Sequence, residues 1–261
     1  AFVKLRPKAM IEIPYAVQGG GTLSAGTGVF VLGDMHSDNT LTFRGWCESN
    51  VSSSSSILWM TFSVPASMNE NVPTVETPHP DVTVYGTYML NGTQYKAYEL
   101  GTSTLTAANV GWLNAELDAD TDNPGRIVIP PKGDVEVDTG VDFYGTLIVD
   151  GNLHIKGNGA NRFTAVAEYP AQICCKNIKL GNDNATLLVN GAVVCKTLDL
   201  DRTDDSLVSI SGALVTTDND GIVDETGSNT YVTLQWNSHY AQYHDFRFTA
   251  EPYTLLSWTD Y

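Results

Sequence analysis

The sequence predicts an all-β protein whose C-terminal half is a parallel β-helix, and three observations lead to this fold class. Helical periodicity is almost absent from the 261 residues, short β-type runs end at Gly, Asn or Asp, and similar segments recur in the second half. We expect an irregular antiparallel β domain over residues 1–125, followed by a right-handed parallel β-helix with an aromatic C-terminal cap over residues 126–261.

The first half contains strand-like runs that are broken by turn residues. Residues 26–32 and 40–46 have strand character, and residues 57–64 form a strongly apolar strand. Five serines at residues 52–56 precede this apolar run, and we interpret them as a linker or a loop tip. These runs predict a β domain with irregular loops.

One hairpin and one helix are also expected before residue 125. Asn91-Gly92 separates two strand-like runs, and Asn-Gly favours the positive φ angles of a two-residue hairpin turn. A short helix is predicted near residues 105–117, where apolar residues recur at helical spacing, namely Leu105, Val110, Leu113 and Leu117.

The second half contains a repeat of about 20 residues. Residues 147–153, 187–193 and 207–214 resemble one another and carry glycines at 151, 191 and 212, whereas residues 174–180 resemble residues 194–200. A single coil of this length cannot bury its apolar face alone, but stacked coils share a continuous core. The repeat therefore predicts a β-helix.

Stacking also brings cysteines together. Equivalent positions in stacked coils are about 4.8 Å apart, so we expect Cys195 to lie beside Cys175 or Cys174. A disulfide is geometrically reachable at this spacing, and two buried thiols are the alternative. The disulfide candidates are Cys174, Cys175 and Cys195.

The charge of the chain excludes some classes of partner. It contains 30 Asp and Glu against 14 Lys and Arg, for a net charge of -16. A nucleic-acid-binding surface is basic, so we expect no nucleic-acid partner. No apolar run is long enough to cross a bilayer, so we expect no direct membrane insertion. Few lysines and many Ser, Thr, Asn and Gly residues favour a secreted, extracellular or cell-surface protein.

Calcium is the cofactor that the acidic loops favour. Residues 118–122 have the D-x-D-x-D pattern with which calcium loops begin, although Asn123 and Ile129 depart from the EF-hand pattern that follows. A second acidic cluster lies at residues 218–225, and a solvated acidic turn is the alternative for both. The candidate calcium ligands are Asp118, Asp120, Asp122, Asp218, Asp220 and Asp224.

The sequence contains no set of residues that predicts catalysis. No nucleophile elbow, Walker A or dinucleotide-binding signature is present, and the five histidines lack metal-binding spacing. We therefore expect a protein that is not an enzyme.

The C-terminus resembles a known family. His239-Tyr240, followed by residues 253–261 with their Ser257-Trp258 segment, is similar to the end of the β-helical domains of type IV pilus-associated proteins, the PilX-like pilin and accessory family. The resemblance covers residues 145–261. Pilins begin with a long apolar helix, and residues 1–14 are too short for one. The resemblance therefore implies that this helix was removed or belongs to a separate short pilin-like subunit.

These observations predict a structural subunit of an extracellular, pilus-like filament, with homo-oligomeric contacts through β edges or the N-terminal arm. The alternative is a carbohydrate-binding or polysaccharide-cleaving β-helix, of the lyase or phage tail-spike type. A surface polysaccharide would then be the partner. The aromatic residues that favour this alternative are Trp46, Trp59, Trp112, Trp236 and Trp258.

The aromatic tail predicts how the β-helix ends. The last coil of a solenoid exposes backbone groups and apolar side chains, and large aromatics bury much area in a short segment. We expect the tail to fold over the last coil or along its flank through Phe246, Phe248, Leu255, Leu256 and Trp258, and docking of the tail onto a neighbouring subunit is the alternative.

Overall fold

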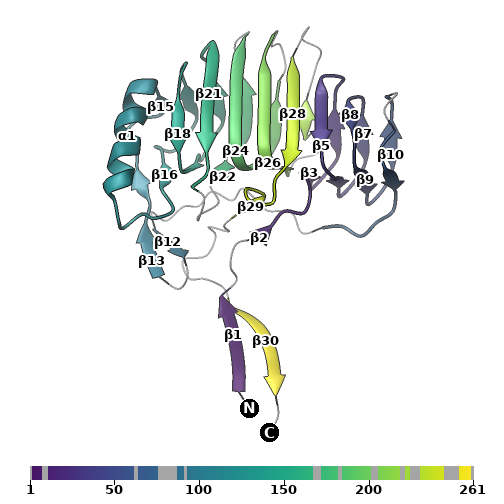
Figure 1. The fold of residues 1–261 in the computed structure, drawn as a ribbon, viewed down its shortest axis with the longest axis horizontal. Coiled ribbons are helices and arrows are strands. Elements are labelled where there is room, and N and C mark those ends of the chain that lie inside the picture. Colours follow the sequence, from purple (N-terminus) through teal and green to yellow (C-terminus); the bar gives the residue numbers. More distant parts are fainter. Residues whose placement is uncertain are drawn as a thin grey trace.

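The structure is a computed structural model of the chain, and it describes residues 2–7, 11–61, 64–75, 87–90, 93–166, 172–181, 184–200, 205–217, 221–223, 230–243 and 253–259. Strands predominate, and the one helix in these ranges, α1 (Ala107–Ala119), lies at one end of the stacked strands (Figure 1). Most strands pair in parallel, so the predicted all-β class with large parallel sheets is confirmed.

The parallel strands lie side by side in three rows. We name each row after its outer face. The open row contains β18 (Asp142–Tyr144), β21 (Gly159–Thr164), the first halves of β24 (Ala185–Cys195) and β26 (Leu207–Thr216), β28 (Tyr231–Trp236), β5 (Val29–Leu32) and β8 (Trp46–Cys47). In Figure 1 this row forms the broad sheet that runs across the molecule.

The covered row shares β24 and β26 with the open row. Its order is β14 (Tyr98–Glu99), β16 (Ile127–Ile129), β19 (Thr146–Ile148), β22 (Gln172–Cys174), the second halves of β24 and β26, β3 (Val17–Gly19), β6 (Met35–Ser37), β9 (Asn50–Ser53) and β11 (Ser67–Asn69). Apolar side chains from its outer side pack with Ile13 and Ala241.

The charged row consists of two sheets. The first contains β15 (Thr104–Leu105), β17 (Val135–Val137), β20 (Leu153–Ile155), β23 (Asn177–Leu180), β25 (Thr197–Asp199) and β27 (Ile222–Val223). The second contains β4 (Leu23–Ala25), β7 (Leu41–Phe43) and β10 (Ile57–Trp59). Glu136, His154, Lys179 and Asp199 occupy one register across the first sheet.

Strands from the first half of the chain continue the stack that the second half begins. In the covered row, Leu214 of β26 pairs with Val17 of β3, which pairs with Met35 of β6 and then Val51 of β9. In the open row, β28 pairs in parallel with β5. One sheet therefore includes strands from both sides of residue 125.

The expectation of an antiparallel N-terminal domain is wrong for the strands between Val17 and Asn69, because their pairings are all parallel. The physical reason is the edge that β26 and β28 would otherwise expose. A row of unpaired backbone groups binds another strand, and here the N-terminal strands fill that place. Alternation of apolar residues predicts a strand but not the direction of its partner.

Three pairs of strands in the described ranges are antiparallel. The predicted hairpin is confirmed, because Leu90 of β12 (Thr87–Leu90) pairs with Thr93 of β13 (Thr93–Lys96). The other pairs join β2 (Ile11–Glu12) with β29 (Gln242–Tyr243), and β1 (Phe2–Pro7) with β30 (Tyr253–Thr259).

The pairing of β1 with β30 corrects the predicted C-terminal cap. Leu255, Leu256 and Trp258 belong to β30, which projects with β1 as a two-stranded ribbon away from the stacked rows (Figure 1). Phe246 and Phe248 lie outside the described residues. The last coil of the second half needs no aromatic cap, because the N-terminal strands already cover it.

The predicted repeat is confirmed for the later segments, whereas the first segment has a different register from the one that the repeat predicted. Gly191 pairs with Gly212, and Ile178 pairs with Leu198 at the expected spacing of 20 residues. Gly212 has φ +151°, and a Cβ there would lie 2.2 Å from the carbonyl oxygen of Gly191, so this corner requires glycine. Leu147, by contrast, shares its register with Val193 rather than Leu187, through Ile173 of β22.

The inner sides of the three rows meet in one apolar core. Alternate residues of the open row, such as Val189, Ile210 and Leu234, are buried, and their neighbours along each strand face outward. Phe143 and Phe163 make an edge contact within this core, with ring centroids 6.1 Å apart. The hydrophobic effect over this continuous core holds the stack together.

The helix forms close to the predicted position. Thr106 is its N-cap: its hydroxyl accepts from the Asn109 backbone N–H, and the Asn109 side chain accepts from the Thr106 N–H, which completes a capping box. Val110, Leu113 and Leu117 are buried, as their spacing predicted.

Candidate interaction site

The two ends of the stacked strands differ, and the helix covers one of them. The side-chain amide of Asn114 in α1 donates to the Asp142 carbonyl at 2.8 Å and accepts from the Tyr144 N–H at 3.1 Å. These bonds occupy backbone groups on the edge of β18. The α1 end of the open row is therefore blocked against further strand pairing.

The opposite end is formed by β10 and β11, which are the last strands of their sheets in the described part of the chain. β10 pairs with β7, and β11 pairs with β9, so each has one edge with no strand partner among the described residues. The carboxylate of Glu70 accepts from the Ile57 N–H at 2.7 Å at this edge. We call residues 51–69 the open coil end.

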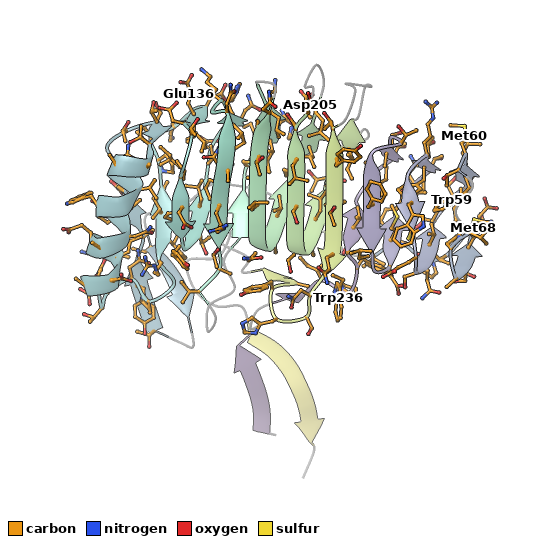
Figure 2. All side chains as sticks on the ribbon, turned by 45° about the horizontal axis from the view of Figure 1, so that its top comes forward. Trp59, Met60, Met68, Glu136, Asp205 and Trp236 are labelled. Atoms are coloured by element: carbon orange, nitrogen blue, oxygen red, sulfur yellow. The ribbon has the colours of Figure 1, made fainter. Side chains whose placement is uncertain are left out.

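The open coil end contains no charged residue and exposes several apolar side chains. Residues 51–69 include no Asp, Glu, Lys or Arg, although the chain has a net charge of -16. Leu58 is 52% exposed and Met68 is 51% exposed, and Met60 and Val64 are also exposed. Figure 2 shows Trp59, Met60 and Met68 together at this end, on the opposite side of the molecule from α1.

Trp59 supports the open coil end from within. Its ring stacks on Phe43 with centroids 4.7 Å apart and packs against the main core, so it is half-buried. The neighbouring Leu58 and Met60 then point outward, because alternate residues of a strand face opposite sides. A rigid strand thus presents exposed apolar side chains.

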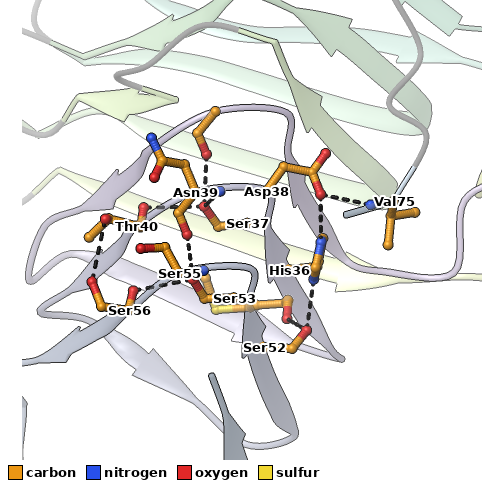
Figure 3. Close-up of polar contacts among 12 residues, drawn as sticks. His36, Ser37, Asp38, Asn39, Thr40, Ser52, Ser53, Ser55, Ser56 and Val75 are labelled. Carbon is orange, nitrogen blue, oxygen red and sulfur yellow. Dashed lines mark hydrogen bonds and ion pairs between the residues drawn. The ribbon is translucent and has the colours of Figure 1, made fainter. Parts of the chain in front are cut away.

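A buried polar network lies one strand inside the open coil end (Figure 3). His36 of β6 is fully buried; its Nε2 lies 2.8 Å from Asp38 Oδ1, and its Nδ1 lies 2.9 Å from Ser52 Oγ. Asp38 Oδ1 also accepts from the Val75 N–H at 2.8 Å. Tyr15 stacks on His36 with ring centroids 5.1 Å apart. No local sequence pattern indicates this network, because its members come from four separate segments.

This network contains Ser, His and Asp, but its geometry differs from that of a serine hydrolase. In such enzymes the serine binds Nε2 and the aspartate binds Nδ1, whereas the imidazole of His36 is reversed. The Ser52 hydroxyl also lies 3.2 Å from the Met35 carbonyl oxygen. Burial, followed by the Asp34 and Asp38 carboxylates, raises the pKa of Tyr15, and Ser52 acts in the opposite direction. We assign the network a role in fixing the coils.

Two residues of the serine run at 52–56 form part of a strand and of the corner at its end. The run is therefore more than the linker or loop tip that we expected. Ser52 and Ser53 belong to β9, and Ser53 is buried. The Ser53 hydroxyl donates to the Asn39 carbonyl, and the Ser37 hydroxyl donates in the same way to the Gly21 carbonyl at 2.8 Å. The two serines are 16 residues apart, so they repeat one corner in successive coils (Figure 3).

The Asp118 and Asp120 carboxylates of the first calcium candidate have partners within the protein. Asp118 forms an ion pair with Arg126, Asp120 accepts from the Asp122 N–H at 2.9 Å, and no group of three potential metal ligands occurs among the described residues. Asp218, Asp220 and Asp224 lie outside the described residues. Calcium binding stays a prediction for both clusters.

The cysteines lie where the repeat placed them. Cys174 of β22 pairs with Val194 of β24, so Cys175 and Cys195 are adjacent in the stack, and both are buried thiols in the structure. The side chain of Cys174 lies outside the described residues, and the disulfide stays a prediction. Burial raises the pKa of the Cys47 thiol, which is also buried.

The tryptophans occupy different environments. Trp46 and Trp112 are exposed, and Trp236 is partly exposed while its indole N–H donates to the Ile13 carbonyl at 3.0 Å. Trp59 is stacked on Phe43, and the side chain of Trp258 lies outside the described residues. Trp46 and Trp236 therefore border the open row, whereas Trp112 belongs to the helix-covered end.

No family model, curated protein or solved structure matches the chain. The resemblance to pilus-associated proteins therefore stays a prediction. Within the described ranges, α1 is too short and too polar to cross a membrane.

Proposed function

We propose that this protein is a structural subunit of an extracellular, pilus-like assembly, and that it joins its neighbour through the open coil end. The observation that carries this proposal is the absence of charge from residues 51–69 in a chain of net charge -16. Proteins commonly protect exposed strand edges with charged residues, which prevents unwanted pairing. Glu70 borders this edge and binds the Ile57 N–H, but β10 and β11 themselves carry no charge, so their exposed side chains are suited to contact.

The net negative charge of the chain favours the open coil end as the place where two copies meet. Two copies repel each other over most of their acidic surfaces, and a neutral end is where they can approach most closely. Exposed Leu58, Met60 and Met68 would lose contact with water in that interface, which favours association. Backbone groups along the outer edge of β11 would pair with the neighbouring copy.

We further propose that the three rows form one closed, right-handed parallel β-helix in which the N-terminal strands are the final coils. The continuous registers through β26, β3, β6 and β9 support this arrangement. Parallel strands that are joined by crossovers within one sheet are nearly always right-handed. A closed helix would leave the open coil end as its free terminus.

A filament needs two unlike contact surfaces, because a contact between identical surfaces closes into a dimer. The β1–β30 ribbon is the second surface that we propose. It pairs with no other strand in the described part of the chain, and an isolated two-stranded ribbon is marginally stable in water. A neighbouring subunit would stabilise it by adding strands.

Sedimentation velocity over a range of concentrations, combined with negative-stain electron microscopy, tests this proposal. We expect the wild-type protein to assemble with increasing concentration. The double variant Leu58→Lys/Met68→Lys places charge on the open coil end and should remain monomeric. The control is Trp112→Lys, which introduces one positive charge on an exposed residue at the helix-covered end and should assemble as the wild type does.

Two results would contradict the proposal. A wild-type protein that stays monomeric at all concentrations would exclude self-association, and unchanged assembly of the double variant would exclude the open coil end as the contact. Circular dichroism of each variant confirms that it is folded. Discrete pairs in the micrographs, without longer assemblies, would restrict the function to dimer formation.

A further inference from the structure

The outer face of the open row is a flat, exposed surface that self-association does not require. Parallel strands β24, β26, β28, β5 and β8 lie side by side across it (Figure 1). With neighbouring strands about 4.8 Å apart, these five span roughly 19 Å. Their inward side chains fill the core, so the outward side chains rest on a rigid base.

This face lacks charge over most of its area. The segments 185–190, 207–211, 231–235 and 29–32 contain no Asp, Glu, Lys or Arg. Charged residues occur only at its margins: Asp142 and Arg162 face each other at 3.9 Å on β18 and β21, and Arg44 and Glu48 flank Trp46. The charged row, by contrast, carries ionisable side chains in register across its strands.

Aromatic side chains gather at one side of this neutral face. Tyr231, Phe30 and Trp46 come from the consecutive strands β28, β5 and β8, and Phe30 is the register partner of Trp46. The rings of Phe30 and Tyr231 have centroids 6.2 Å apart. Tyr231 is 47% exposed and Trp46 is 39% exposed, so much of each ring faces water.

Uncharged hydrogen-bonding groups surround the aromatics. Ser209, Thr233 and Phe30 share one register, while Asn190 and Gln235 belong to the next register along the same strands. Hydroxyl and amide groups of this kind both donate and accept hydrogen bonds. The face therefore combines apolar ring surfaces with neutral polar groups on a rigid sheet.

We infer that this face binds a neutral polysaccharide. A sugar ring has an apolar side that can lie on an aromatic ring, and hydroxyl groups at its edge that can bond with Thr, Asn and Gln side chains. An acidic polysaccharide would be repelled by a chain of net charge -16, and the basic side chains Arg162 and Arg44 lie only at the margins of this face, where Arg162 is opposite Asp142. A flat surface of several parallel strands suits an extended chain of sugars.

Binding to defined polysaccharides tests this inference. The full chain is mixed with insoluble cellulose and chitin, and run through native gels that contain starch, mannan or β-1,3-glucan; alginate and polygalacturonate are the acidic comparisons. We expect binding to at least one neutral polysaccharide and to neither acidic one. Affinity should change little between low and high salt, because charge pairs do not contribute to it.

Matched variants locate the binding surface. Phe30→Ala/Trp46→Ala should lower the affinity at least tenfold, and Tyr231→Ala should lower it less. Trp112→Ala removes an exposed tryptophan from the helix-covered end and should bind as the wild type does. Leu58→Lys/Met68→Lys should also bind normally, so a failure of self-association can be distinguished from a failure of polysaccharide binding. Melting temperatures confirm that each variant is folded.

Several outcomes would overturn the inference. These are no binding to any neutral polysaccharide, equal binding to the acidic ones, or equal loss in the Trp112→Ala control. If Phe30→Ala/Trp46→Ala abolishes self-association while the wild type binds no polysaccharide, the face is a contact between copies of this chain instead.

Discussion

Replacing Leu214 by alanine tests whether the N-terminal strands stack on the second half of the chain. Leu214 lies in β26 between Val193 of β24 and Val17 of β3, and it is fully buried. Its backbone N–H donates to the Ala16 carbonyl at 2.9 Å. If β3 did not lie there, Leu214 would belong to the last coil and would be covered on one side only.

The enclosure of Leu214 between β24 and β3 determines how much stability the substitution should cost. Truncating a leucine that is enclosed on all sides typically costs about 2–5 kcal/mol, because burial is lost and a cavity remains. A cost of about 3 kcal/mol would lower the melting temperature by roughly 6–12 °C in a chain of this size. Val17→Ala should couple with Leu214→Ala by about 0.5–3 kcal/mol in a double-mutant cycle, because the two side chains are neighbours.

Urea unfolding followed by circular dichroism measures these costs. The matched control is Leu207→Ala, the same substitution in the same strand, where the side chain faces outward and is partly exposed. We expect this control to cost about 1 kcal/mol or less. The stacking is refuted if Leu214→Ala costs no more than Leu207→Ala and if its effect adds simply to that of Val17→Ala.

Three further predictions follow from single residues. Gly212→Ala should destabilise the protein by at least about 2 kcal/mol, because its Cβ would meet a backbone carbonyl at a positive φ angle, whereas Gly101→Ala meets nothing within 4 Å; thermal denaturation compares the two. Thr106→Ala removes the N-cap of α1 and should cost about 1 kcal/mol in urea unfolding, and Thr106→Ser should retain the stability. The pKa of Tyr15 is raised by burial, so its contribution to stability is present below about pH 10 and is lost as pH rises through the higher folded value. Unfolding of Tyr15→Phe measured from pH 8 to 11 should therefore show a smaller alkaline loss than the wild type; an identical loss would exclude this role.

Local patterns in the sequence were sufficient to predict the individual elements. The β class, the Asn91-Gly92 hairpin, the helix with buried Val110, Leu113 and Leu117, and the 20-residue offset between Ile178 and Leu198 are each confirmed. Each depends on residues that are near one another in the chain. Turn chemistry, periodicity and the lengths of the coils are visible at that range.

The candidate surfaces could be predicted only in part from the sequence. Strand alternation marks Leu58 and Tyr231 as residues on one side of a strand, but it does not tell which side faces the core. Trp46 was recognised as an aromatic that could bind sugars, whereas Phe30 was not, because its nearness to Tyr231 depends on the pairing of β5 with β28. The network of His36, Asp38 and Ser52 was missed for the same reason.

The sequence by itself determined the β class and the stacked strands of the second half, because burial and turn geometry act locally on each strand. The tertiary structure alone decided that the N-terminal strands join the same parallel sheets. It placed β3 and β5 against β26 and β28, about 200 residues away in the chain, and it made β10 and β11 the last strands of their sheets in the described part of the chain. Backbone hydrogen bonds between strands are the same for every sequence, so a strand edge accepts a partner from any part of the chain. Only the packing of the complete core selects which partner that is.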